Sequence, residues 1–183
     1  MKDILKPVIV LTCICLVVTA MLAYVNYITE PVIIRAEEEA ASASRSEVLS
    51  EAKDFKKIDI NGLPEGVTEV YKGSVKNKLC GYVVLMQAKG YGGVIKMICG
   101  LRPDGTIEAV KTLSHSETSG LGTKAVDNGS GYRQKFAGKT AENYKAVDTV
   151  TGATISSTAY KKAIGLAFEA FDRIKEAEHE NAE

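Results

Sequence analysis

The sequence is poor in the residues that most catalytic and metal-binding sites use. Its 183 residues include no tryptophan, two histidines and four cysteines, and no two cysteines form a Cys-x-x-Cys pair. The cysteine spacing therefore matches neither a zinc site nor a thioredoxin-type motif, and no metal site is predicted. No nucleophile, histidine and acid form an arrangement that indicates a hydrolase. Basic and acidic residues both number 23, so no basic excess indicates binding to nucleic acid.

Charge is absent from residues 7–29, a run of 23 residues. As a helix this run is about 35 Å long, enough to cross a hydrocarbon core of about 30 Å. A cleaved signal peptide is the alternative, but its apolar region is usually only about 7–15 residues long. The step Thr19-Ala20-Met21 is also a poor cleavage site. We therefore predict a retained transmembrane anchor over residues 1–30.

The charges on the two sides of this run differ in sign. Lys2 and Lys6 precede it, whereas Glu30 and the acidic residues 37–39 follow it. Because positive residues stay on the cytoplasmic side, the N-terminus is predicted in the cytoplasm and the rest of the chain outside. The protein is thus expected to cross the cytoplasmic membrane once, with its domain on the extracytoplasmic side.

The remainder of the chain predicts one small α+β domain. Residues 31–56 are rich in alanine and glutamate and predict a helical connector, with a helix over 32–53. Runs of β-forming residues follow at 67–72, 79–87, 93–101 and 106–113, joined by short turns that favour an antiparallel sheet. Residues 131–138 predict a short helix or turn. Residues 156–177 predict a long helix whose apolar stripe includes Ile155, Ala159 and Ile174. The sheet flanked by helices is predicted over residues 57–178, followed by a polar tail at 179–183.

Two cysteines lie in neighbouring predicted strands. If residues 79–87 and 93–101 form a hairpin around Gly90, Cys80 and Cys99 lie nearly opposite each other. A disulfide is chemically allowed outside the cytoplasm. Two adjacent buried thiols are the alternative, and the sequence leaves both open.

Three segments combine small residues with polar ones. Gly90-Tyr91-Gly92-Gly93 separates two strands, residues 115–124 (HSETSGLGTK) follow a strand, and residues 148–154 (DTVTGAT) precede the long helix. Small residues let a ligand touch the backbone, and a helix N-terminus offers unpaired N–H groups to a phosphate. The simpler interpretations are a hairpin loop, a polar loop around a hydrogen-bonded histidine and a helix N-cap cluster.

In this order behind one N-terminal anchor, the three segments resemble the FMN-binding domain of the G subunit of the Rnf electron-transport complex. The C subunit of the Na⁺-translocating NADH:quinone reductase shares that domain. Thr29-Glu30-Pro31, just after the anchor, also looks like this family. The second loop of the family is usually HxETPGLG, and here Ser119 stands where proline is usual. The length of the chain favours the Rnf subunit.

The resemblance implies which residues hold the cofactor. In the family, FMN is joined through its phosphate to a threonine hydroxyl in a motif resembling D-x-x-[S/T]-G-A-T, which implies attachment to Thr154. Ser156 and Ser157 are nearby hydroxyls that could be mistaken for it. The other implied cofactor-binding residues are Glu117, Thr118, Gly120, Leu121, Gly122, Lys124, Thr151, Gly152 and Ala153. The motif-supporting residues are Asp148, Tyr91 and His115.

The resemblance implies an electron-transfer subunit that carries covalent FMN. The complex would couple ferredoxin:NAD⁺ electron transfer to Na⁺ or H⁺ translocation. Its other membrane, iron–sulfur and flavin subunits would be the partners, and a flavin transferase acting on FAD would attach the cofactor. The chain alone would catalyse no complete reaction, because it holds no NAD site and no iron–sulfur motif. The alternatives are a covalent-FMN subunit of a quinone reductase or extracellular flavin system, and a cofactor-free anchored binding module.

Overall fold

The computed structural model describes residues 2–180, and the side chains of residues 6–179. The chain divides into two compact units, Met1–Ala40 and Ala41–Glu183. The first helix, α1 (Lys2–Val48), contributes to both units. The predicted fold class, one N-terminal apolar helix followed by an α+β domain, is confirmed.

The first unit is a helix whose described side chains are exposed along its length. It is long and apolar enough to cross a membrane. The hydroxyls of Thr12, Thr19 and Thr29 each donate a hydrogen bond to the carbonyl four residues earlier, at 2.7–2.9 Å. These hydroxyls therefore need no water, as a position in lipid requires.

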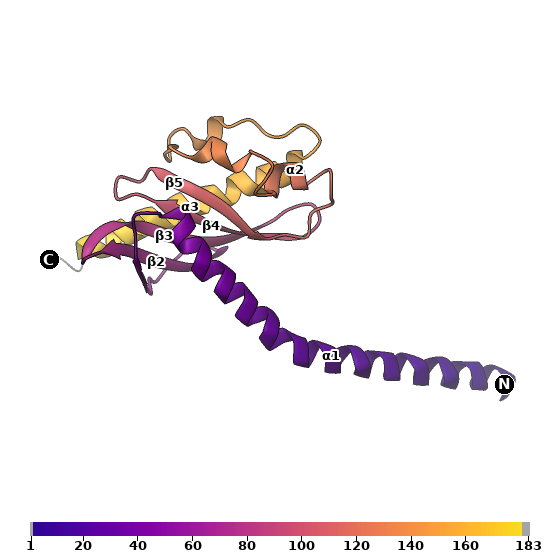
Figure 1. Cartoon of the computed structure of the whole chain (residues 1–183). Coiled ribbons are helices and arrows are strands. Elements are labelled where there is room, and N and C mark those ends of the chain that lie inside the picture. The colour runs from indigo at the N-terminus through magenta and orange to yellow at the C-terminus, as the bar shows by residue number, and fades with distance from the viewer. Residues whose placement is uncertain (1, 181–183) are drawn as a thin grey trace. The chain divides into compact units, whose positions relative to one another are not determined.

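The second unit is built on a five-stranded sheet whose order follows the sequence (Figure 1). The strands are β1 (Asp54–Lys57), β2 (Val67–Val75), β3 (Lys78–Lys89), β4 (Val94–Leu101) and β5 (Ile107–Ser114). Every neighbouring pair is antiparallel. The four predicted strands are all present. The predicted helix over 32–53 is too long, because α1 ends at Val48 and the chain then turns into β1.

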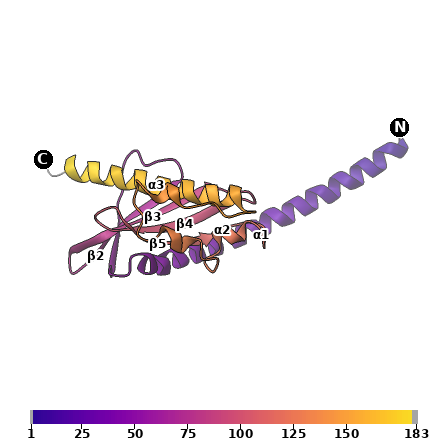
Figure 2. The same ribbon diagram turned by 90° about the horizontal axis from the view of Figure 1, so that it is seen from above.

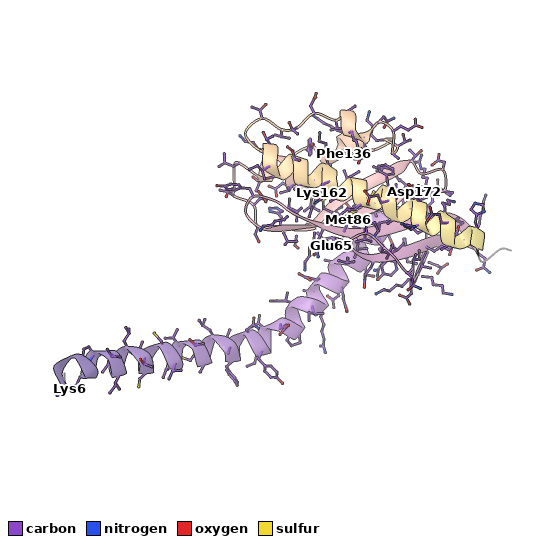
Figure 3. The ribbon with its side chains drawn as sticks, turned by 180° about the vertical axis from the view of Figure 1, so that it is seen from behind. Lys6, Glu65, Met86, Phe136, Lys162 and Asp172 are labelled. Atoms are coloured by element: carbon purple, nitrogen blue, oxygen red, sulfur yellow. The ribbon has the colours of Figure 1, made fainter. Side chains whose placement is uncertain are left out.

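Helix α3 (Thr154–Glu180) lies across one face of the sheet, alongside β3 and β4 (Figures 1 and 2). Its buried side includes Tyr160, Ile164 and Phe168, which belong to the main core. Figure 3 shows Lys162 and Asp172 on the outer side of α3, with Met86 in the sheet beneath. The prediction that Ile155 joins the buried stripe is wrong: its side chain is 57% exposed in the first turn of α3.

The last turns of α1 cover the opposite face of the sheet. Val48, Leu49 and Ala52 pack against residues of β3 and β4 and form a second, smaller core. Between β5 and α3 the chain forms α2 (Thr123–Val126), η1 (Arg133–Phe136) and η2 (Tyr144–Ala146). The 3₁₀ helix η1 confirms the short helix predicted within residues 131–138. Helix α2 contacts α3 and closes one end of the main core.

Cys80 and Cys99 do not lie opposite each other, which corrects the predicted juxtaposition. The hairpin closes at Lys89↔Val94, so Cys99 pairs with Val84. Cys99 is buried in the main core, whereas Cys80 packs against the smaller core on the other face. The prediction was wrong because the loop spans Gly90 to Gly93, which shifts the register relative to a hairpin centred on Gly90. Both thiols are free.

Candidate functional site

The first two glycine-rich segments lie at the same end of the sheet. The hairpin loop between β3 and β4 is closed by a hydrogen bond from the Gly90 N–H to the Gly93 carbonyl, at 2.8 Å. Lys96, near the start of β4, pairs with Ser114, the last residue of β5. The loop that begins at His115 therefore leaves the sheet beside the hairpin loop.

Glu117 joins these two loops to the start of α3. Its side chain is buried, with 8% of the residue exposed. Oε1 accepts a hydrogen bond from the Gly92 N–H at 3.0 Å, and Oε2 accepts one from the Ser156 hydroxyl at 2.6 Å. Gly92 is 25 residues before Glu117 and Ser156 is 39 residues after it. One carboxylate of the second segment thus contacts the first segment and the first turn of α3, which directly follows the third segment.

His115 belongs to the same loop and is held from both sides of its ring. The Glu117 N–H donates to Nδ1 at 3.3 Å, and Nε2 lies 2.9 Å from Oδ1 of Asp127. Since Nδ1 accepts, the proton of the neutral ring lies on Nε2, which donates to the Asp127 carboxylate. His115 therefore links the second loop to the end of α2.

The third segment makes a turn directly into α3. The Ala153 N–H donates to the Val150 carbonyl at 2.9 Å, and Gly152 has φ +80°, a conformation that favours glycine. Helix α3 then begins at Thr154. The first N–H groups of any helix have no acceptor within it, so this end can receive an anion.

The hydroxyls around this turn differ in exposure. Thr154 is exposed, whereas Ser156 and Ser157 are 2% and 0% exposed. The Ser157 hydroxyl donates to the Ala153 carbonyl at 2.8 Å and accepts from the Val150 N–H at 3.2 Å. The Ser156 hydroxyl donates to Glu117. Of these three hydroxyls, only that of Thr154 is open to a large reactant.

Exposed apolar side chains lie on or directly next to the same three segments. Within residues 41–179, the large apolar side chains that remain exposed are Tyr91 (73%), Val94 (47%), Leu121 (53%) and Ile155 (57%). Tyr91 and Val94 lie on the hairpin, Leu121 on the second loop, and Ile155 next to Thr154. We call these four residues the apolar quartet. An apolar surface confined to a few neighbouring loops is typical of a ligand or partner site.

The other predicted site residues lie on the surface of these loops. Thr118, Gly120, Lys124, Thr151 and Gly152 are exposed, whereas Gly122 and Ala153 are buried. The second loop is folded on itself, since the Gly120 N–H donates to the Thr123 hydroxyl at 2.9 Å.

Asp148, the first residue of the third segment, is exposed. Burial, with a smaller contribution from the Asp148 charge, raises the pKa of Tyr132 to about 12. No described contact brings Asp148 to the Glu117 carboxylate.

Sequence reasoning missed four contributors to this site. Ser156 was considered only as a competing hydroxyl, Ile155 was assigned to the apolar stripe of the long helix, and Asp127 and Val94 were not considered. Val94 and Ile155 carried no usable signal, because an apolar residue at a strand start or in a helical stripe is ordinarily buried. Asp127 could have been noticed only by knowing which residue faces His115.

Comparisons with known proteins show the family of the chain. Residues 90–169 match the family described as FMN-binding domain, and residues 1–48 match the RnfG N-terminal region. The G subunit of the proton-translocating ferredoxin:NAD⁺ oxidoreductase complex of Clostridium ljungdahlii is 32% identical over 168 residues. That match covers 87% of this chain and 86% of the relative. The chain belongs to the family of Rnf complex G subunits.

Two further proteins are similar to this family member. The G subunit of the Na⁺-translocating ferredoxin:NAD⁺ oxidoreductase complex of Acetobacterium woodii is 28% identical, with 94% of each chain covered. The crystal structure of Shewanella oneidensis NqrC is 23% identical, with a TM-score of 0.47 over 61% of this chain and 68% of that one.

Membership of this family makes the chain a membrane-anchored electron-transfer subunit with an FMN-binding domain. Its relatives are subunits of oxidoreductase complexes. The residues of the three segments fit FMN, the group that the family implies. They offer an exposed hydroxyl at the start of a long helix for a phosphate, and exposed apolar side chains for a flat ring.

Proposed function

We propose that this chain carries FMN through a phosphoester to Thr154 and relays electrons within a membrane complex. The complex couples ferredoxin:NAD⁺ electron transfer to the translocation of Na⁺ or H⁺. The names of the relatives support this class of reaction, and they include one proton-translocating and one Na⁺-translocating complex. The observation that carries the proposed site is the exposure of Thr154 beside two buried, hydrogen-bonded serines.

The position of Thr154 suits a phosphodiester, which keeps one negative charge. The helix that begins there has 27 residues, so its terminal N–H groups carry a fully developed helix dipole. An anion at such an end gains about 0.3–1 kcal/mol when it is exposed. Gly152 leaves open space, because a Cβ added to it would meet nothing within 4 Å.

The apolar quartet offers a surface against which the isoalloxazine ring would lie. Leu121 and Ile155 would cover part of the ring, and Tyr91 would stack or pack at its edge. Thr118 and Lys124, both exposed, would face its polar edge or the phosphate. A ring held on an open surface remains accessible to partner subunits, so the covalent bond, rather than a deep pocket, retains the cofactor.

Attachment is a transfer from FAD by a flavin transferase. The Thr154 oxygen forms a bond to the phosphorus of the FMN half, and the pyrophosphate P–O bond breaks. AMP leaves with the electron pair of that bond, and the hydroxyl proton is released. Bound FMN supplies the electron transfer, whereas the protein binds and orients it.

The sidedness of the protein follows from the charges around α1. With Lys6 on the cytoplasmic side and the acidic residues 37–39 beyond the span, the FMN-binding domain lies outside the cytoplasm. Free FMN is scarce there, so a covalent link prevents irreversible loss of the cofactor.

Mass measurement tests the attachment site. The full chain, co-expressed with a flavin transferase, is expected to gain the mass of FMN minus water, and the modified peptide is expected to contain Thr154. Thr154→Ala should abolish the gain. Thr158→Ala removes another exposed hydroxyl one turn later in α3 and should keep it. Wild-type protein without added mass, or a Thr154→Ala protein that stays yellow after denaturation, would refute the proposal.

A further inference from the structure

The Glu117 carboxylate is enclosed by glycines from two loops. A Cβ added to Gly90 would lie 2.1 Å from Oε1, and one added to Gly122 would lie 2.2 Å from Oε2. Real Cβ atoms do not approach oxygen so closely, so any side chain at either position would displace the carboxylate. The Gly122 backbone has φ −60° and ψ −33°, which any residue can adopt. Gly122 is therefore explained by the room that Glu117 needs, rather than by its backbone conformation.

The hydrogen bonds of Glu117 connect an exposed loop to a long helix. Gly92 is in the exposed hairpin loop, and its N–H is bonded to Glu117. Ser156 is in the first turn of α3, two residues after Thr154. Hydrogen bonds to a charged group are stronger than neutral ones, particularly when the group is buried. Both oxygens of Glu117 are thus occupied by groups of the protein itself.

We propose that Glu117 is a positioning residue that assembles the acceptor site around Thr154 before the flavin arrives. It acts through Gly92 and Ser156: it holds the hairpin and the second loop against the first turn of α3, and so orients the Thr154 hydroxyl and the apolar quartet. The proposal rests on the proposed attachment of FMN to Thr154. In this proposal, Gly90 and Gly122 are glycines because any side chain at either position would displace the Glu117 carboxylate.

The test compares three variants of the full chain in detergent with the wild type. Glu117→Ala removes both hydrogen bonds. In Glu117→Gln, the amide oxygen can accept from the Gly92 N–H while the amide N–H₂ donates to the Ser156 hydroxyl. Glu108→Ala is the matched control, because the Glu108 carboxylate also accepts from a backbone N–H and a serine hydroxyl, those of Ser50 at 2.9 and 2.7 Å. Ser50 and Glu108 lie on none of the three segments around Thr154.

Two readouts are made. The first is amide hydrogen exchange at Gly92 in protein without flavin, where Glu117→Ala should speed exchange about tenfold or more. The second is the initial rate at which a flavin transferase with FAD modifies Thr154, which Glu117→Ala should lower about tenfold or more, since misplaced reacting groups react slowly. Glu117→Gln should restore most of both values, and Glu108→Ala should change neither.

A Glu117→Ala protein with wild-type Gly92 exchange and wild-type modification of Thr154 would overturn the proposal. So would Glu108→Ala slowing the modification as much as Glu117→Ala. If Glu117→Ala does not fold, Gly122→Ala serves instead, because its Cβ displaces the carboxylate without removing it. It should speed Gly92 exchange in flavin-free protein, and unchanged exchange would refute the proposal. A wild-type protein that never accepts FMN at Thr154 refutes the proposed function, whereas the Gly92 exchange measurement does not depend on it.

Discussion

Three glycines on adjacent strands form the surface on which the end of α1 lies. A Cβ on Gly73 would meet Leu49 at 2.4 Å, one on Gly81 would meet Leu49 at 3.0 Å, and one on Gly100 would meet the Val48 carbonyl oxygen at 2.0 Å. Gly73 and Gly81 are directly paired, and Gly100 lies on the next strand. The absence of side chains at these positions lets the helix backbone approach the sheet closely.

Gly100→Ala should therefore destabilise the domain. Its Cβ meets backbone, which cannot rotate away, so we expect a loss of about 1–3 kcal/mol in the free energy of unfolding. Denaturant unfolding of the detergent-solubilised chain measures it. Gly129→Ala is the control, because its Cβ would meet nothing within 4 Å and the change should stay within about 0.5 kcal/mol. Equal losses in the two variants would contradict this explanation.

Leu121→Ser tests whether the apolar quartet serves a ligand or the fold. Because Leu121 is 53% exposed, we expect a change within about 0.5 kcal/mol in the free energy of unfolding of the flavin-free chain. In protein that mass measurement shows to be flavinylated, the fluorescence of the ring should change because its apolar cover is reduced. Lys162→Ser, on the outer side of α3, should leave the fluorescence unaltered. A flavin spectrum identical to the wild type would argue against ring contact with Leu121.

At the scale of elements, charged groups hold the end of α1 to β5. The hydrogen bond from Lys111, together with the positive charge of Arg133, keeps the pKa of Glu47 below its usual value. Burial raises the pKa of Glu108, but the hydrogen bonds from Ser50 and the hydrogen bond and charge of Arg102 together outweigh burial and leave that pKa below its usual value. Both carboxylates thus favour the folded state when they are ionised.

Acid should weaken this attachment. A carboxyl whose pKa is lower in the folded than in the unfolded chain adds stability above its unfolded pKa of about 4.3. That contribution disappears as the pH falls through the lower, folded pKa. Urea unfolding at about pH 7 and about pH 3.5 should therefore show a smaller pH-dependent loss in Glu108→Gln than in the wild type. An equal loss would mean that Glu108 is not linked to folding.

The elements differ in how far the sequence could predict them. The four predicted strands are runs of β-forming residues bounded by turns, and the 27-residue helix α3 has a helical period, so these elements were predicted with boundary errors of a few residues. Strand β1, with the sequence DFKK, has no such pattern and exists because it pairs with β2 at the sheet edge. Helix α2 has four residues, too few for any periodicity to appear. The register of the hairpin depended on loop length, which composition alone did not give.

At the scale of the whole molecule, the sidedness of the domain is testable with exposed lysines. Lys124 and Lys162 are exposed in the FMN-binding domain, whereas Lys6 precedes the membrane-spanning run. In cells whose cytoplasmic membrane is sealed but whose outer layers are permeable, a membrane-impermeant amine reagent should label Lys124 and Lys162 but not Lys6. Inside-out vesicles should give the reverse pattern. Labelling of Lys124 only in inside-out vesicles would place the domain in the cytoplasm.

The site as a whole was accessible to sequence reasoning only in part. The motif order identified the family and the three loops, because those short patterns are local in sequence. The contact that unites the loops was not local, since Glu117 meets Gly92 and Ser156 across 25 and 39 residues. From the sequence, Glu117 was predicted to contact the flavin. The fold shows that its carboxylate accepts hydrogen bonds from Gly92 and Ser156.

Strand β4 runs from the exposed apolar surface of the domain to the place where the end of α1 packs on the sheet. Its first residue, Val94, belongs to the exposed apolar surface, and Gly100, its seventh, lies under the Val48 carbonyl. At about 3.3 Å per residue, some 20 Å of extended backbone separates them. Because β4 is hydrogen-bonded to β3 and β5 along this length, the proposed flavin site and the end of α1 lie at opposite ends of one fixed strand.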